Sequence, residues 1–294
     1  MKNKILDGNI VSNYLKRQIK FGISRLTIKP TLAVIMIGNN TASKVYVKNK
    51  SKACKEVGIQ YIEYNFDENI DEESVLNLIN ELNKDETING ILVQAPLPKH
   101  LNEKKIFEAI SPKKDVDGFS STNIGKLSLN EKDAIIPCTP AGIMKILDFY
   151  NIEIEGKNVV IIGRSNIVGK PMLQCMLERN ATVTICHSKT KKLKNFTKKA
   201  DILIVAIGKS KFIKKNMIKK NCVIIDVGIN RDENNKLSGD VDFNNVLKKC
   251  KMITPVPRRS RKNDCSNVNV QYMASFKAKI KKCIKTSFYP LFKL

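Results

Sequence analysis

Near the start of the chain, a tyrosine and a lysine occur at a spacing that could support proton-transfer chemistry. Tyr46 and Lys50 follow residues 38–41, Gly-Asn-Asn-Thr, whose asparagine and threonine side chains are typical helix caps. Residues four apart lie on the same face of a helix, so the phenol can orient the ammonium group. A lysine in a partly closed cleft can lose its proton and act as a base. The alternative is an ordinary Tyr–Lys pair on a helix surface.

Two later loops carry polar groups that could bind a ligand. Gln94 ends an apolar run and is followed by Ala-Pro-Leu-Pro, in which the prolines restrict the backbone. Asp115 and Asp117 are separated by one residue in Lys-Asp-Val-Asp-Gly. Both segments could equally be ordinary turns, because proline and Asp-Gly are common turn residues.

A glycine-containing loop follows the apolar run Val159–Ile162 and extends from Gly163 to Gly169. An unbroken apolar run is typical of a strand buried on both faces of a parallel sheet. Glycines before a helix N-terminus allow backbone amides to bind phosphate, and Arg164 within the loop could bind an additional phosphate. The spacing differs from Gly-x-Gly-x-x-Gly, so an ordinary strand–turn–helix is the alternative.

Apolar runs of strand length alternate with helical patterns along the chain, which predicts an α/β protein. The predicted strands form two sets, the first at 31–37, 60–64 and 90–94, and the second at 158–162, 182–186, 201–207 and 222–226. Residues 111–140 are predicted to be rich in loops. We therefore expect two domains with a boundary near residues 140–150 and a ligand site in the cleft between them.

The composition of the 294 residues, 42% hydrophobic and 27% charged, predicts a soluble globular protein. No apolar run approaches the roughly 18 residues of a membrane helix, and Asp7 and Asn9 interrupt any N-terminal signal sequence. The eight cysteines form no Cys-x-x-Cys pair, which fits reduced thiols and argues against a zinc site. We therefore expect a cytoplasmic protein without a metal or a membrane partner.

The formal net charge of +24 raises the possibility of nucleic-acid binding. The basic residues are mostly lysines spread over the chain, however, and no aromatic residues interleave with them to stack bases. The pattern favours solvated lysines with some attraction for anionic ligands over a nucleic-acid partner.

Several short motifs acquire more meaning from their combination and order than any has alone. They are Tyr-x-x-x-Lys, Gln-x-Pro-Leu-Pro, Lys-Asp-Val-Asp-Gly, Pro-Cys-Thr-Pro-x-Gly (137–142), Gly-Arg-Ser-x-x-Val-Gly-x-Pro, Asp-Val-Gly-Ile-Asn (226–230), Gly-Asp-Val-Asp (239–242) and Thr-Pro-Val-Pro (254–257). Together they closely resemble the bifunctional methylenetetrahydrofolate dehydrogenase/methenyltetrahydrofolate cyclohydrolase family over residues 1–257.

The resemblance implies two α/β domains around a cleft. Residues 1–140 would form a folate-binding catalytic domain, and residues 141–257 a Rossmann-like parallel-sheet domain that binds NADP. The expected reactions are NADP-dependent oxidation of 5,10-methylenetetrahydrofolate and hydrolysis of the 5,10-methenyl product to 10-formyltetrahydrofolate. A tetrahydrofolate substrate and a homodimer are further expectations from the family.

The family's functional residues can be carried over to positions of this sequence that match its motifs. Lys50 matches the catalytic lysine, Tyr46 its partner near the folate, and Gln94 the glutamine that hydrogen-bonds and tunes the lysine. Asp117 matches the carboxylate that holds the pterin, whose N–H groups a carboxylate can accept. A tuned lysine suits the hydrolytic step, which requires activated water or a proton transfer near neutral pH.

The resemblance also implies a set of cofactor-binding residues: Gly163, Arg164, Ser165, Gly169, His187, Ser188 and Ile229. Arg164 and Ser165 would receive the 2′-phosphate and so favour NADP over NAD. His187 and Ser188 would line the adenosine end without taking part in the chemistry.

The resemblance stops after residue 257, where the chain continues Arg-Arg-Ser-Arg-Lys-Asn-Asp-Cys-Ser. One set of codons for these residues, AGG AGG AGT AGG AAA AAT GAC TGT AGC, reads Gly-Gly-Val-Gly-Lys-Met-Thr-Val-Ala when the first base is skipped. The family has a Gly-Gly-Val-Gly loop and Met-Thr at this point, followed by an apolar helix. We therefore interpret residues 258–294 as an aberrant basic tail produced by a reading-frame slip, replacing the glycine loop and closing helix.

This interpretation predicts that the chain folds over most of residues 1–257 but is unstable and weakly active or inactive. Two alternatives remain open. The chain could be a non-catalytic remnant that still binds nucleotide, or residues 258–294 could be a genuine basic arm that binds RNA or a membrane surface. That segment contains ten lysines and arginines against a single acidic residue, Asp264.

Overall fold

The computed structural model of the chain describes residues 4–231 and 236–256, which form two compact units. The first unit comprises residues 12–142, and the second comprises residues 4–11 together with residues 143–256. The chain passes from one unit to the other inside α1 (Gly8–Ser24) and again inside α6 (Cys138–Phe149). The predicted aberrant tail, residues 258–294, lies outside the described residues.

A parallel sheet in the order β2-β1-β3 forms the centre of the first unit. Its strands are β1 (Thr31–Ile37), β2 (Gln60–Phe66) and β3 (Ile88–Val93), which confirms the first predicted set. Every residue of the central strand β1 is buried, as its unbroken apolar run predicts. No residue of β2 is fully buried, because this strand lies at the edge of the sheet.

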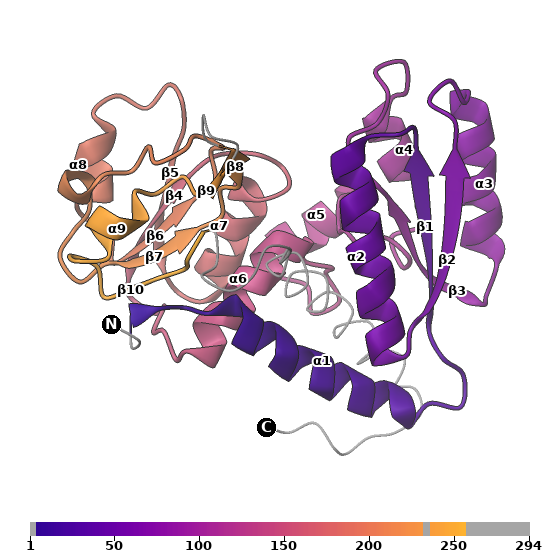
Figure 1. Cartoon of the computed structure of the whole chain (residues 1–294), viewed down its shortest axis with the longest axis horizontal. Helices are drawn as coiled ribbons and strands as arrows, with labels where there is room; N and C mark the ends of the chain where they lie inside the picture. Colours follow the sequence, from indigo (N-terminus) through magenta and orange to yellow (C-terminus); the bar gives the residue numbers. More distant parts are fainter. Residues whose placement is uncertain (1–3, 232–235, 257–294) are drawn as a thin grey trace. The chain divides into compact units, whose positions relative to one another are not determined.

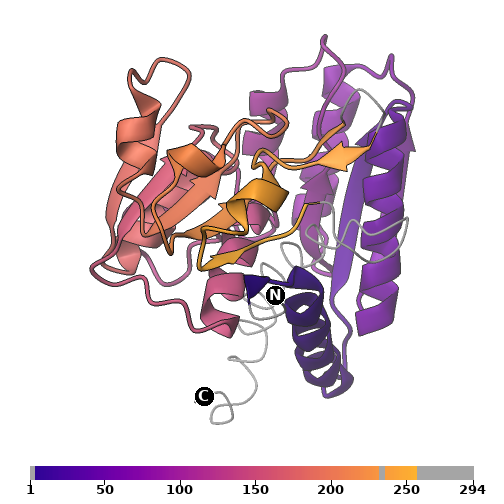
Figure 2. The ribbon, with the colours of Figure 1, turned by 60° about the vertical axis from the view of Figure 1, so that its left-hand side comes forward.

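Helices cover both faces of this sheet. They are α2 (Thr41–Val57) on one face, and α3 (Glu72–Lys84) with α4 (Glu103–Ala109) on the other. Helix α5 (Ser121–Ser128) also belongs to this unit. Ile79 of α3 and Ile106 of α4 pack in one buried cluster with Ala33 and Ile35 of β1. Both views place the strands between α2 and α3 (Figures 1 and 2). The carboxyl ends of the strands are therefore the open edge at which loop residues can gather.

The second unit contains a five-stranded parallel sheet in the order β10-β7-β6-β4-β5. The strands are β4 (Asn158–Ile162), β5 (Thr182–Cys186), β6 (Ile202–Val205), β7 (Val223–Asp226) and β10 (Met252–Ile253). From β4 the chain continues to β5 on one side and then crosses to β6 on the other, so the order reverses between β4 and β6. This arrangement confirms the predicted Rossmann-like sheet, in which ligands bind outside the carboxyl ends at such a reversal.

Short elements complete the second unit. They are α7 (Gly169–Glu178), α8 (Leu193–Thr197), the 3-10 helix η2 (Lys215–Met217), α9 (Phe243–Val246) and an antiparallel pair, β8 (Asn230–Arg231) with β9 (Leu237–Ser238). Within the described residues, no helix is sufficiently long and apolar to cross a membrane.

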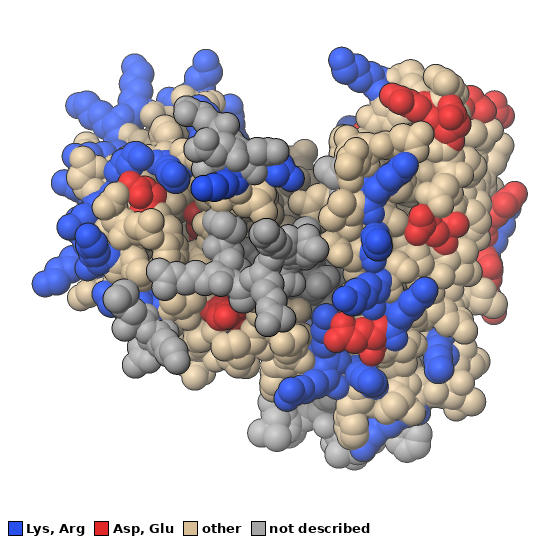
Figure 3. All heavy atoms as spheres, viewed as in Figure 1, with Lys and Arg blue, Asp and Glu red and all other residues tan. Residues whose placement is uncertain are grey.

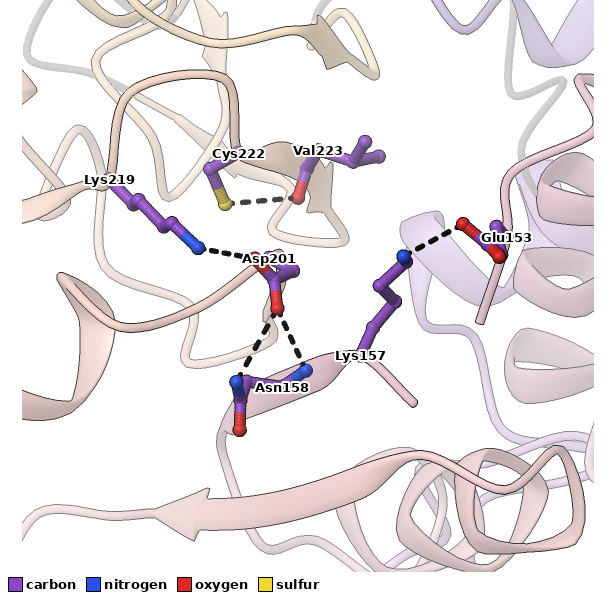
Figure 4. A network of polar contacts seen from close by, with 7 residues as sticks. All are labelled: Glu153, Lys157, Asn158, Asp201, Lys219, Cys222 and Val223. Carbon is purple, nitrogen blue, oxygen red and sulfur yellow. Dashed lines mark hydrogen bonds and ion pairs between the residues drawn. The ribbon is translucent and has the colours of Figure 1, made fainter. Parts of the chain in front are cut away.

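A polar network joins the amino ends of three strands in the second unit (Figure 4). Asp201, just before β6, accepts hydrogen bonds from the backbone N–H of Asn158 at 3.0 Å and from the ammonium group of Lys219. The Asn158 side-chain amide also approaches this carboxylate, at 3.5 Å. The network therefore stabilises the edge of the sheet opposite the carboxyl ends of its strands.

The prediction that residues 111–140 are rich in loops is wrong in part. Helix α5 lies in this range and α6 begins in it, at Cys138. Ser120 caps α5 by accepting a hydrogen bond from the Asn123 backbone N–H at 3.3 Å. The helix has only eight residues, and its buried side chains are Asn123 and Leu127, so its apolar pattern is too short to identify a helix from the sequence.

Candidate active site

Helix α2 carries Tyr46 and Lys50 and has a well-defined start. The Asn40 side chain caps it by accepting a hydrogen bond from the Ser43 backbone N–H at 3.0 Å. Val47 and Cys54 are buried, which fixes the rotation of the helix against the sheet. Tyr46 and Lys50 are consequently half-buried, one turn apart on the adjoining face.

Gln94, immediately after β3, meets Lys50 directly. Its backbone N–H donates to Ile35 O at 2.9 Å, and its side-chain Nε2 donates to Ala95 O at 2.7 Å. These two bonds hold the amide with Oε1 as the remaining acceptor, and Lys50 Nζ donates to Oε1 at 2.9 Å. The contact orients the lysine ammonium group at the carboxyl edge of the first sheet.

Asp115 and Asp117 have different environments, although only one residue separates them. Residues 114–116 run parallel to β3, with a hydrogen bond from Ile91 N to Lys114 O at 2.8 Å. Asp115 is 2% exposed, and its carboxylate accepts from the backbone N–H groups of Gly118 at 2.8 Å and Ser120 at 2.9 Å. Its fixed place shapes the loop that presents Asp117.

Asp117 is half-buried and lies just beyond the segment that pairs with β3. It therefore lies at the carboxyl edge of the first sheet, as Gln94 does. The thiol of Cys138, at the start of α6, donates to Asp117 Oδ1 at 3.4 Å. The first unit therefore gathers a lysine, an amide and a carboxylate at one edge. This set can bind N–H groups of a ligand and move a proton.

A hollow of about 480 Å³ also occurs in the first unit, but it is a different place. Lys44 and Lys48 of α2 and Glu63 and Asn65 of β2 line it, and none of the predicted site residues does. We do not assign the catalytic chemistry to this hollow, because its lining contains no contact comparable to the Lys50–Gln94 pair.

In the second unit the glycine loop lies at the point where the strand order reverses. A Cβ atom on Gly163 would lie 2.3 Å from Ala206 O, and one on Gly169 would lie 2.2 Å from Gly163 O. Neither position has room for a side chain, so the loop packs tightly between the end of β6 and the start of α7. The cradle fits a dinucleotide pyrophosphate, which requires close backbone approach at a helix N-terminus.

The other predicted cofactor residues lie at the carboxyl ends of the same sheet. Arg164 and Ser165 are exposed, and the Ser165 hydroxyl orders the loop by accepting from Val168 N at 3.2 Å. Gly163 N donates to Cys186 O at 2.9 Å, which places His187 and Ser188 beside the glycine loop at the end of β5. Ile229 follows β7, two strands away from β4, and is 50% exposed.

Two residues that the motifs contain received no role from the sequence. Cys138 belongs to Pro-Cys-Thr-Pro and contacts Asp117. Asp240 belongs to Gly-Asp-Val-Asp and is completely buried. The sequence feature that could have drawn attention to Asp240 is a carboxylate between a glycine and a valine. The sequence does not show, however, that this carboxylate would be buried among backbone N–H donors.

The fold and the glycine loop place this chain in the class of α/β proteins that have two units, one of them a Rossmann-like dinucleotide-binding unit. Residues 137–259 match the model of the tetrahydrofolate dehydrogenase/cyclohydrolase NAD(P)-binding domain, and residues 6–117 match that of the family's catalytic domain. The chain therefore belongs to the tetrahydrofolate dehydrogenase/cyclohydrolase family, as the motifs predict.

Individual relatives agree with this assignment. The bifunctional protein FolD of Campylobacter hominis is 52% identical over 257 residues, covering 86% of this chain and 90% of that protein. The structure of bifunctional FolD from Campylobacter jejuni has a TM-score of 0.90 at 44% identity, covering 96% of this chain and 99% of that one. The Trypanosoma brucei FolD structure, complexed with NADP and an inhibitor, has a TM-score of 0.86 at 28% identity, with coverages of 96% and 98%.

Proposed function

We propose that the chain carries the two activities of its family, with Lys50 and Gln94 at the reacting centre. The activities are NADP-dependent oxidation of 5,10-methylenetetrahydrofolate to the 5,10-methenyl compound and hydrolysis of that compound to 10-formyltetrahydrofolate. The observation that carries the proposal is the 2.9 Å hydrogen bond between Lys50 Nζ and an amide oxygen that has no freedom to turn away. NADP, when bound, accepts the hydride in the first reaction.

The lysine supplies the proton transfer of the hydrolytic reaction. An ammonium group has three donors, and Gln94 Oε1 takes one of them. Nζ, oriented by Gln94, would position a water molecule beside the folate or move a proton to or from it. Gln94 restricts the motion of Nζ, so the proton is held at one place relative to the bound substrate.

Asp117 would hold the pterin by accepting its N–H groups. The Cys138 thiol donates to Asp117 Oδ1, and the buried Asp115 fixes the loop by accepting from the Gly118 backbone N–H. The Asp117 carboxylate would thus position the substrate from a loop whose backbone is already ordered without the ligand.

The residues at the carboxyl ends of the second sheet would hold NADP. Gly163 and Gly169 allow backbone approach to the pyrophosphate, and Arg164 with Ser165 would bind the 2′-phosphate that distinguishes NADP from NAD. His187 and Ser188 would line the adenosine end, and Ile229 would contact the cofactor from the end of β7. Lysines of α8 and its flanks are exposed, in the part of the molecule where Figure 3 shows many basic side chains, and they would attract this anionic cofactor.

We also propose that the protein is a cytoplasmic homodimer without a nucleic-acid partner. The edge strand β2 supports the dimer, because it exposes 40% of the apolar side chain of Ile62. The six cysteines among the described residues form no disulfide, which suits a reducing compartment.

The altered C-terminus is the reason to expect impaired activity in the chain as printed. The family's glycine loop permits close approach to folate and cofactor, whereas Arg258 and Arg259 would add bulk and charge there. Exposed apolar side chains on α1, 48% for Tyr14 and 57% for Phe21, fit the loss of a covering helix. This proposal concerns residues that lie outside the described part of the chain.

The Lys50→Met variant tests the proposed role of the lysine. We expect hydrolysis of 5,10-methenyltetrahydrofolate to fall at least 100-fold below that of the parent chain, because general acid–base groups contribute about that much. The NADP dissociation constant should stay unchanged. The matched control is Lys48→Met, an exposed lysine on the same helix, which should keep both properties.

Undiminished hydrolysis in the Lys50→Met variant would refute the assignment of Lys50. NADP binding without either reaction, both in the parent chain and after residues 258–294 are replaced by the C-terminal segment of a relative, would favour the nucleotide-binding remnant instead. Salt-dependent RNA binding that disappears on deletion of residues 258–294 would favour the basic-arm alternative.

A further inference from the structure

Asp240 lies at the centre of a backbone loop that the proposed chemistry does not explain. Its side chain is 0% exposed. Oδ2 accepts from the backbone N–H groups of Ile207 at 2.7 Å and Gly208 at 3.1 Å, and Oδ1 accepts from Lys209 N at 2.7 Å. The Asn230 side-chain amide donates to Oδ1 at 2.9 Å. One carboxylate therefore fixes three consecutive peptide groups, which begin two residues after the end of β6.

A second buried carboxylate holds Asp240 in place. Asp226, at the end of β7 and 4% exposed, accepts from the backbone N–H groups of Asp240 at 3.0 Å and Val241 at 2.9 Å. Burial, reinforced by the negative charge of Asp240, raises the pKa of Asp226 to about 7. A Cβ atom on Gly228 would lie 2.2 Å from the Asp240 carboxylate, so that residue must be glycine for the carboxylate to fit.

The loop that Asp240 fixes, residues 207–209, lies where the strand order reverses. β6 is the neighbour of β4, and the end of β6 packs against Gly163 of the glycine loop. In dinucleotide-binding sheets the strand after the glycine loop carries the group that binds the adenosine ribose, and here that strand is β5. The other half of the dinucleotide must then extend over the opposite side of the reversal, toward β6 and β7.

We propose that Asp240 is a positioning residue for the nicotinamide half of NADP. It acts through the backbone of residues 207–209, whose shape it sets by binding three successive N–H groups. Asp226 holds the backbone from which Asp240 projects. The inference rests on the proposed function in that NADP is taken to be the ligand of this sheet edge.

The Asp240→Asn variant of the full chain tests the inference through binding rather than activity. An amide in this place turns one acceptor oxygen into a donor that faces backbone donors, so residues 207–209 lose their support. We expect NADP binding to weaken about tenfold or more. Binding of 2′,5′-ADP, which has the adenosine half and the 2′-phosphate but no nicotinamide, should be unchanged.

The matched control is Asp242→Asn in the same Gly-Asp-Val-Asp motif. Asp242 is half-buried; its carboxylate accepts from Asn245 Nδ2 at 2.9 Å and pairs with Lys214 Nζ at 3.7 Å, and neither partner belongs to residues 207–209. Its substitution should leave the affinities for NADP and 2′,5′-ADP unchanged. Circular dichroism and denaturant unfolding establish that each variant is folded at the titration temperature.

Equal weakening of both ligands by Asp240→Asn would overturn the inference, because a general structural role predicts that result. Unchanged NADP affinity would overturn it as well. If Asp240→Asn does not fold, Asn230→Ala decides, since it removes one donor to Asp240 and should weaken NADP alone by about threefold. A parent chain that binds neither ligand refutes the proposed function itself, and the inference with it.

Discussion

At the scale of single residues, the site is built from pairs in which a buried group orders an accessible one. Asp115 is buried in the first unit, and its carboxylate orders the loop by accepting backbone hydrogen bonds. Asp117 is half-buried and accepts a hydrogen bond from the Cys138 thiol. Gln94 is fixed through its own backbone and amide, and it orients Lys50. Supporting and ligand-facing residues should therefore respond differently to substitution.

The two aspartates of Lys-Asp-Val-Asp-Gly provide a direct test of this division. Asp115→Asn should lower the free energy of unfolding by about 2 kcal/mol, because an amide cannot accept from all of the buried donors around it. Asp117→Asn should leave the unfolding free energy nearly unchanged and weaken tetrahydrofolate binding at least tenfold. Urea unfolding and a calorimetric folate titration measure the two effects, and the reverse pattern would contradict the assignment.

The sequence could identify these residues but not their division of labour. The motif Lys-Asp-Val-Asp-Gly indicates two carboxylates, and only the family resemblance singles out Asp117. Burial of Asp115 depends on the pairing of residues 114–116 with β3, which is a contact between distant parts of the chain. The role of Asp240 was not predicted for the same reason, because its three backbone donors, residues 207–209, lie more than thirty residues earlier.

At the scale of elements, the candidate ligand-binding residues lie at the carboxyl edges of the two parallel sheets, and other parts of each sheet carry the stabilising contacts. In the second sheet the amino edge is secured by Asp201, which links the starts of β4 and β6 and the segment before β7 (Figure 4). The hydrogen bond from Lys219, followed by that from the Asn158 backbone, holds the pKa of Asp201 below its ordinary value. The contribution of Asp201 to stability must therefore depend on pH.

Asp201→Asn should lower the free energy of unfolding by about 1 kcal/mol at neutral pH, a modest value because the carboxylate is partly exposed. A depressed pKa in the folded state stabilises the fold above the unfolded pKa of about 4, and this contribution is lost as pH falls through the folded value. The difference between parent and variant should therefore shrink below about pH 4. Thermal unfolding across the acidic range measures it.

The control for this experiment is Glu153→Gln. Glu153 pairs with Lys157 at 2.7 Å in the same neighbourhood, but its side chain is 73% exposed. Solvent screens such a pair, so its loss should leave the unfolding curve unchanged. A larger effect from Glu153→Gln than from Asp201→Asn would contradict the role given to the amino-edge network.

The strands were predictable because their signal is local. β1 and β4 coincide with the apolar runs that predict them, residues 31–37 and 158–162. Short elements were not predictable, because β8, β9 and β10 have two residues each and owe their form to neighbours. Helix α5 was not predicted because its eight residues are too few for an apolar period to stand out.

At the scale of the whole molecule, family membership rests on both units, and we propose that the C-terminal segment departs from the family pattern. The matched family domains end at residue 259, close to where the motifs stop at residue 257. Our account therefore contains two linked claims. Residues 1–257 carry the determinants of both activities, and residues 258–294 replace a segment that those activities require.

The most direct test is the rate of NADPH formation from 5,10-methylenetetrahydrofolate, compared between two proteins. One is the printed chain, and the other joins residues 1–257 to the corresponding C-terminal segment of the Campylobacter hominis relative. The account predicts NADP-dependent turnover by the joined protein and a rate about 100-fold lower for the printed chain, the loss expected from misplaced groups around the substrate. A joined protein that is folded but produces no NADPH would contradict the central claim, and equal rates would contradict the role assigned to the altered C-terminus.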